Sequence, residues 1–162
     1  MYLPASNAVD SESVAQVLRR FRVIFNAVRS HFRQVEKQVG LGGAQVWALS
    51  VVHARPGIGI GELAQCMDIH QSTASNLVRG LLSKSLITQT RGALDKRHVH
   101  LHTTAAADGV LDKAPAPFEG VLPAALAQLP TATLAQLDVN LAELMRLLQA
   151  DQQAANIPLA DL

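Results

Sequence analysis

The sequence is poor in aromatic residues, in cysteine and in long apolar runs, and each shortage excludes a class of protein. Aromatic residues make up 4% of the 162 positions, too few for the stacking platforms that bind single-stranded nucleic acid. The single cysteine, Cys66, excludes an internal disulfide framework and a multi-cysteine zinc site. No apolar run approaches the ~18 residues that cross a bilayer, and the N-terminus lacks a secretory pattern. We therefore expect a cytoplasmic protein with no membrane partner.

Composition indicates one compact globular domain with an uneven charge. Apolar residues make up 49% and charged residues 17%, which is enough apolar material for a substantial core. Residues 1–100 carry 12 Lys and Arg against 6 Asp and Glu, whereas residues 101–162 carry 2 against 7. This asymmetry suggests that the N-terminal part faces a polyanion. A chance drift of charge along the chain explains it equally well.

Motifs of common enzymes are missing. The sequence has no nucleophile elbow, no Walker phosphate loop and no zinc-protease helix. The glycine-rich stretch GIGIG at 57–61 lacks the spacing of a phosphate loop. We therefore expect neither an enzyme nor a cofactor.

Apolar residues at intervals of three and four predict long helices at both ends of the chain. One helix is predicted over 10–39, and a shorter one over 44–54. Prolines 115, 117 and 123 predict a broken helix after 105–113. The predicted helix over 131–149 carries a leucine seam: Leu134, Leu137, Leu141, Leu144 and Leu148. The first helix and this seam suggest packing against a second copy of the chain. A long helix in a monomeric bundle and an internal leucine core are the alternatives.

The middle of the chain has the pattern of a winged helix-turn-helix. A two-turn helix over 61–69 is followed by a turn near Asp68 and a helix from 70 or 71 to 84. Two short strands, 86–90 and 98–103, then flank a basic loop. The second helix has an apolar inner face and a hydrogen-bonding outer face. Residues 70–100 carry five basic side chains against Asp95 alone, a patch that suits phosphate neutralisation.

The segments IGIGELAQCMDIHQSTASNLVRGLLSKSLI (58–87) and TRGALDKRHVHLHTT (90–104) resemble the MarR family of bacterial winged-helix regulators. The resemblance implies a mainly α fold with a small β-hairpin wing: a winged helix-turn-helix plus a helical dimerisation region. The DNA-binding domain would span 41–104, the dimerisation region 10–40 and 105–150, and a C-terminal tail 151–162.

The resemblance also implies a function. The chain would act as a homodimeric regulator, more commonly a repressor, on a pseudo-palindromic double-stranded operator. The wing arginine, Arg97, would enter the minor groove while Asp95 orients it. The expected DNA contacts are Gln71, Ser72, Thr73, Ser75, Asn76, Arg79, Arg91, Asp95, Lys96 and Arg97.

Regulators of this family commonly bind small aromatic acids or phenols where the dimer helices meet the winged domain. The expected lining here is Phe25, Arg29, Phe32, Trp47 and Val51, with Arg29 as the partner of an anion. The alternative is that the three aromatic side chains belong to the core and that Arg29 is solvated.

Two further features leave rival functions open. His98, His100 and His102 share one strand face, so two of them with an acidic residue could bind a metal. We favour a polar outer face there and expect no metal. Cys66 is expected to be a buried structural thiol rather than a redox sensor. A metal- or redox-responsive regulator, and an interaction module that does not bind DNA, are the rival functions.

Overall fold

The computed structural model describes residues 11–91 and 99–161. Asp95, Lys96, Arg97 and His98 lie outside these ranges. The elements are α1 (Ser11–Val39), α2 (Gly43–Ala54), α3 (Ile60–Met67), α4 (Gln71–Ser83), β1 (Ile87–Arg91), β2 (Val99–Thr103), α5 (Ala105–Lys113), α6 (Val121–Leu126), α7 (Thr131–Leu148) and the short 3-10 helices η1 (Gln152–Asn156) and η2 (Leu159–Asp161). The mainly α fold with one hairpin is confirmed, with helix bounds close to the predicted ones.

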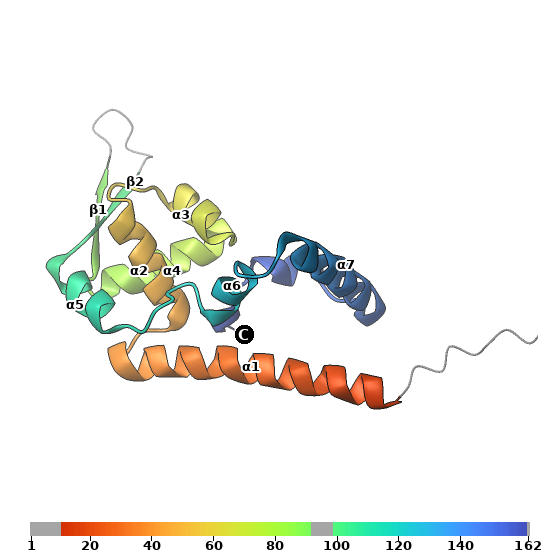
Figure 1. Ribbon diagram of the computed structural model, residues 1–162. Coiled ribbons are helices and arrows are strands. Elements are labelled where there is room, and N and C mark those ends of the chain that lie inside the picture. The colour runs from red at the N-terminus through yellow and green to blue at the C-terminus, as the bar shows by residue number, and fades with distance from the viewer. Residues whose placement is uncertain (1–10, 92–98, 162) are drawn as a thin grey trace, which may run out of the picture.

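The molecule consists of a winged head and a helical region that share α1 (Figure 1). The head, made of α2 to α5 and the hairpin, stands over the C-terminal end of α1. α6 lies beside the middle of α1, and α7 lies farther from α1. α1 ends at Gly40, which has φ 68° and donates its N–H to the Glu36 carbonyl over 2.8 Å. This left-handed residue turns the chain into the head.

The core lies in the head. Its largest fully buried side chains include Leu49, Leu63, Met67, Leu81, Ile87 and Leu101. The turn between α3 and α4 is made by Asp68, which has φ 52°, and by Ile69, which donates its N–H to the Ala64 carbonyl over 3.0 Å. α3 and α4 therefore meet at a tight turn, as in a helix-turn-helix.

Within the head, the second strand of the hairpin packs against the helices. β1 and β2 pair antiparallel, with Thr90 opposite His100 and Thr88 opposite His102. Leu101 points to the core and is 0% exposed. Its backbone also bridges to Ile58 in the loop before α3. The base of the wing is thereby tied to the helix-turn-helix.

The proline-rich segment is broken as predicted. α5 stops at Lys113, and the next helix, α6, begins only at Val121. Pro123 is tolerated because it lies in the first turn of α6, where no intrahelical N–H donor is needed. The segment is held to α1 by His31, whose Nε2 lies 3.1 Å from the Pro117 carbonyl oxygen.

The leucine seam of α7 does not belong to the core of the described chain. No residue of α7 is buried, and Leu134, Leu141 and Leu148 are 39%, 38% and 67% exposed. The internal-core alternative is therefore wrong for this helix. No helix within residues 11–91 and 99–161 is both long and apolar enough to cross a membrane.

The prediction that Cys66 is buried is wrong. Cys66 is exposed, and Arg55 Nη1 donates a hydrogen bond to its Sγ over 3.1 Å. On so short a helix, Leu63, Ala64 and Met67 alone fill the inward face. Cys66 precedes Met67 by one residue, and this step turns its side chain by about 100° away from the core.

Candidate nucleic-acid interface

α4 separates an apolar face from a polar one. Ala74, Leu77 and Val78 are buried against the head. The opposite face holds the six predicted reading residues: Gln71, Ser72, Asn76 and Arg79 are exposed, and Thr73 and Ser75 are half-buried. The structure therefore brings the helical part of the predicted DNA site onto one surface.

Two hydrogen bonds organise the polar face of α4. The Ser75 hydroxyl donates to the Gln71 carbonyl oxygen over 2.8 Å, so its lone pairs remain available as acceptors. Arg79 Nη1 donates to Asn76 Oδ1 over 3.0 Å. Asn76 and Arg79 therefore act as one hydrogen-bonding unit, which presents mainly donors. Guanine O6 and N7 accept such donors in the major groove. Residue spacing alone did not reveal this pairing.

α4 packs closely against α2. A methyl group on Gly80 would come within 2.5 Å of Gln45 Nε2. A larger residue at position 80 would require the Gln45 side chain to move. The exposed face of α4 is consequently supported from behind by a packed helix rather than by a loop.

Part of the predicted wing site can be placed. Arg91 is exposed at the end of β1, where it pairs with Val99. Asp95, Lys96 and Arg97 lie outside the described residues, so their role in the wing stays a prediction. Arg91 adds a positive charge at the loop end of the hairpin.

The outer face of the hairpin is polar. His100 Nδ1–H donates to the Gly57 carbonyl oxygen over 2.9 Å, and His102 is half-buried. In residues 11–91 and 99–161, no group of three His, Cys, Asp or Glu side chains could hold a metal ion. His98 lies outside these ranges. The described part of the row thus forms a solvated face over buried Leu101.

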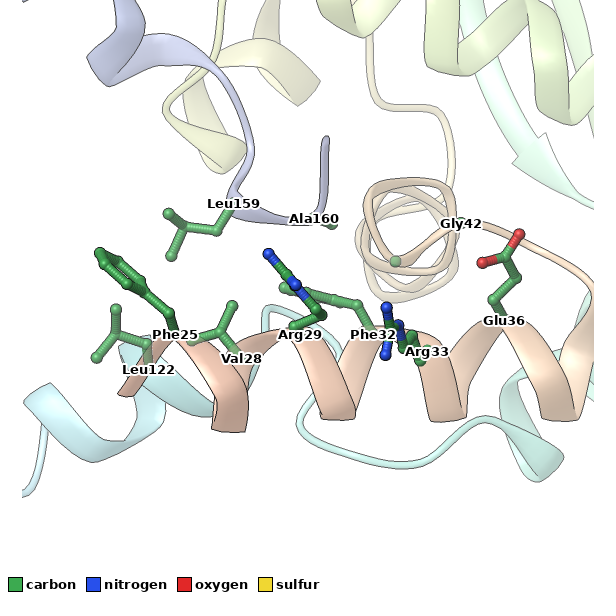
Figure 2. Close-up of a pocket in the computed structure, with 11 residues that line it drawn as sticks. Phe25, Val28, Arg29, Phe32, Arg33, Glu36, Gly42, Leu122, Leu159 and Ala160 are labelled. Atoms are coloured by element: carbon green, nitrogen blue, oxygen red, sulfur yellow. The ribbon is translucent and has the colours of Figure 1, made fainter. Parts of the chain in front are cut away.

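A second candidate site is a cleft of about 370 Å³ between α1 and the C-terminal segment. The cleft is lined by Phe25, Val28, Arg29, Phe32, Arg33, Glu36, Gly42, Gly43, Leu122, Leu159 and Ala160 (Figure 2). Three of the five predicted effector residues, Phe25, Arg29 and Phe32, line it together. Figure 2 shows the Arg29 guanidinium pointing from α1 toward Leu159 and Ala160.

Phe32 is held in place by two glycines. A methyl group on Gly43 would overlap the Phe32 ring, and one on Gly120 would approach its Cζ to 2.9 Å. Phe32 is therefore packed as a fixed wall of the cleft. Phe25 is 63% exposed and stacks on Phe21, with ring centroids 5.9 Å apart.

Trp47 and Val51, the other two predicted effector residues, do not line this cleft. Trp47 borders a neighbouring small cavity with Pro158 and Leu159. Val51 borders a separate hollow beside Cys66. Both lie on α2, whose outer surface turns away from Phe25 as the helix winds.

The cleft combines apolar walls with charged side chains on α1. Arg29, Arg33 and Glu36 form no ion pair with any residue in the described part of the chain. Arg33 and Glu36 follow Arg29 by four and seven residues, so helical spacing could have placed them beside it. Leu159 and Ala160 could not be found this way, because the C-terminal segment has no periodic pattern.

Residues 39–98 match the sequence model of the MarR family. No protein with curated annotation matches the chain significantly. Among solved structures, a crystal structure of MarR is 26% identical, with a TM-score of 0.51, over 59% of this chain and 70% of its own.

Two further structures share the fold over most of the chain. The MepR–DNA complex from S. aureus is 23% identical, with a TM-score of 0.57, over 80% of this chain and 96% of its own. The multiple antibiotic-resistance repressor from Listeria monocytogenes is 21% identical, with a TM-score of 0.50, over 86% and 96%. At these identities the likeness concerns the fold alone.

Proposed function

Residues 39–98 place the winged-helix part of this chain in the MarR family, and from that premise we propose a homodimeric, sequence-specific regulator of transcription. Its target is a pseudo-palindromic site in double-stranded DNA. The observation that carries the proposal is the division of α4 into a buried apolar face and an exposed hydrogen-bonding face. The related fold of S. aureus MepR was solved in complex with DNA, which supports the same partner here.

α4 is proposed to lie in the major groove. Its N-terminal residues Gln71 and Ser72 reach base edges or phosphates, and the Asn76–Arg79 pair reads bases further along the helix. Thr73 and Ser75 complete this surface. In the wing, Arg97 is proposed to enter the flanking minor groove, with Asp95 as its orienting partner. Arg91 and Lys96 would neutralise nearby phosphates.

The helical region is proposed to dimerise. Val14, Val17 and Leu18 of α1 are 46%, 50% and 48% exposed. In the α7 seam, Leu134, Leu141, Leu144 and Leu148 are exposed as well. Monomeric proteins rarely leave such contiguous apolar stripes in water. A two-fold dimer would present two copies of α4, about one helical turn of DNA apart. Repression would follow from occupying a promoter.

Binding experiments on double-stranded DNA test this function. Duplexes selected from a random pool with the wild-type protein supply the site. Asn76→Ala should then change the preference among variants of that site more than the affinity for random DNA. Equal losses on both would make Asn76 a positioning residue only. A failure to enrich any duplex, even at low salt, would favour the interaction module that does not bind DNA.

The cleft is proposed to bind an effector with an aromatic ring and a carboxylate or phenol. Apolar walls suit the ring, and the Arg29 guanidinium suits the anion. A ligand at 100 times its Kd should stabilise the protein by about 2.7 kcal/mol. Thermal-shift screening of aromatic acids measures this. Arg29→Ala should abolish the shift, whereas Arg22→Ala, on the same helix but outside the cleft, should keep it. A shift that survives Arg29→Ala would contradict the assignment.

A further inference from the structure

The C-terminal segment folds back onto the molecule. After α7, Gln149 takes a left-handed conformation with φ 50° and reverses the chain. Asp151 Oδ1 then accepts the Gln153 N–H over 2.9 Å and starts η1. Residues 151–161, here called the C-terminal strap, run from this turn back toward α1. Nothing in the pattern of the strap predicts where it packs.

The middle of the strap touches the start of the reading helix. Asn156 Nδ2 lies 3.5 Å from Nε2 of His70. His70 is the N-cap residue of α4, directly before the predicted base-contacting residues. The strap therefore reaches the end of α4 that a winged helix directs toward DNA.

The C-terminal end of the strap is anchored beside the cleft. Pro158 is buried, and a methyl group on Gly43 would stand 3.0 Å from the Cβ of Ala160. Leu159 and Ala160 form one wall of the cleft, opposite Arg29 (Figure 2). A single segment thus contacts both the cleft and the start of the reading helix.

The charge of the strap opposes DNA. It carries Asp151 and Asp161 and no Lys or Arg. DNA phosphates approach the N-terminal end of a reading helix, where free N–H groups and the helix dipole favour anions. Asn156 occupies space at that place, and the net negative charge of the strap adds a repulsion of the phosphate backbone. The docked strap and bound DNA consequently exclude each other in part.

We propose that the C-terminal strap is an autoinhibitory contact: docked, it lowers the affinity of the head for DNA, and DNA binding releases it. The proposal rests on the DNA-binding function proposed above. Because Leu159 and Ala160 are a wall of the cleft, a molecule bound there favours the docked strap. By linkage, such a molecule opposes DNA through the strap.

Trp47 reports whether the strap is docked. It is the only tryptophan of the chain and shares a small cavity with Pro158, Leu159 and Ala160. Release of the strap exposes the indole to water, so its emission should shift to longer wavelength and acrylamide should quench it more. Adding the selected duplex to the wild-type protein should produce the same change.

Two variants remove the contact in different ways. Deletion of residues 151–162 removes the strap, and Ala160→Glu undocks it in the full-length chain. Both should shift Trp47 emission and bind the selected duplex about fivefold or more tightly. Ala150→Glu adds the same charge at an exposed position before the strap and should change neither quantity. Light scattering checks that each variant keeps its oligomeric state. If the deletion changes the oligomeric state, the affinity and emission of Ala160→Glu alone test the proposal.

The outcomes separate this proposal from the function on which it rests. If the wild-type protein selects no duplex, the DNA-binding function fails. If the wild-type protein binds DNA while both strap variants keep wild-type affinity, the proposal of an autoinhibitory strap is overturned and the DNA-binding function stands. Benzoate, used as an aromatic-anion probe, should raise the duplex Kd of the wild type and leave that of the deletion unchanged. A rise in both, or in neither, overturns the link between the cleft and the strap.

Discussion

The head and the helical region differ in the exposure of their apolar side chains. In the head, Leu49, Leu63 and Leu81 are 0% exposed, and the four helices and the hairpin of the head form the core around them. In the helical region, Val17 of α1 and Leu148 of α7 are 50% and 67% exposed. The hydrophobic effect is the same in both. The head satisfies it within one chain, whereas the helical region leaves these side chains exposed to solvent, in keeping with the dimer proposed above.

The first prediction concerns the stability of the core of the head. Leu81→Ala leaves a cavity in a fully packed core and should reduce the free energy of unfolding by about 2–5 kcal/mol. Urea denaturation measures the loss. Leu147→Ala, the same change at a residue 66% exposed, should cost less than about 0.5 kcal/mol. Equal losses at the two positions would contradict the division into a closed head and an open region.

The second prediction concerns substitutions that disrupt the proposed dimer interface of the helical region and leave the head folded. Leu137→Glu combined with Leu141→Glu places like charges in the proposed interface and should weaken the dimer about 100-fold. Light scattering over a concentration series measures this weakening. Circular dichroism should show the head still folded, since neither residue belongs to its core. A dimer of wild-type strength would mean that α1 alone forms the interface.

The third prediction concerns the charged surface of the head. Arg97→Ala should weaken binding of the selected duplex by about 1–3 kcal/mol in each half-site, because the wing no longer reaches its groove, and should leave folding intact. The slope of log affinity against log salt should fall by about one unit for each phosphate that is no longer neutralised. Titrations at several salt concentrations measure both. An unchanged affinity would remove Arg97 from the DNA site. Arg22→Ala on α1 is the matched control.

The smallest expected effect lies where the two regions meet. Partial burial raises the pKa of Asp161 above its ordinary value, because the docked carboxyl is poorly solvated when ionised. Docking of the strap is therefore weakened as the pH rises through this pKa and strengthened as the pH falls below it. Trp47 emission should shift to shorter wavelength on acidification just above the ordinary range of an aspartate. Asp161→Asn should flatten this profile; identical profiles would contradict the role of Asp161 in the pH dependence of docking.

Much of the surface proposed to read DNA could be predicted because its signals are local. Apolar spacing along residues 71–82 already separates the inner face of α4 from Gln71, Asn76 and Arg79. Alternation in β2 likewise separates His100 and His102 from Leu101. These patterns follow from the 3.6-residue and 2-residue repeats of helix and strand. They therefore needed no knowledge of the neighbouring elements.

Cys66 shows that a local pattern does not always predict whether a side chain is buried. Its position among Leu63, Ala64 and Met67 suggested burial, but the width of the apolar stripe on so short a helix depends on what packs against it. Trp47 and Val51 show the same limit. They lie on the predicted helix α2, yet they face cavities other than the cleft. Which side of a helix meets a given neighbour depends on how the helices cross.

The sequence by itself determined the helices, the hairpin, the two faces of α4 and the apolar stripes of α1 and α7, because each is a repeat written into neighbouring residues. The tertiary structure alone decided the cleft and the path of the strap. His70 and Asn156 are 86 positions apart, and Phe32 is seated between Gly43 and Gly120. Such contacts leave no periodic trace, because they arise only when packing brings distant segments into the same volume.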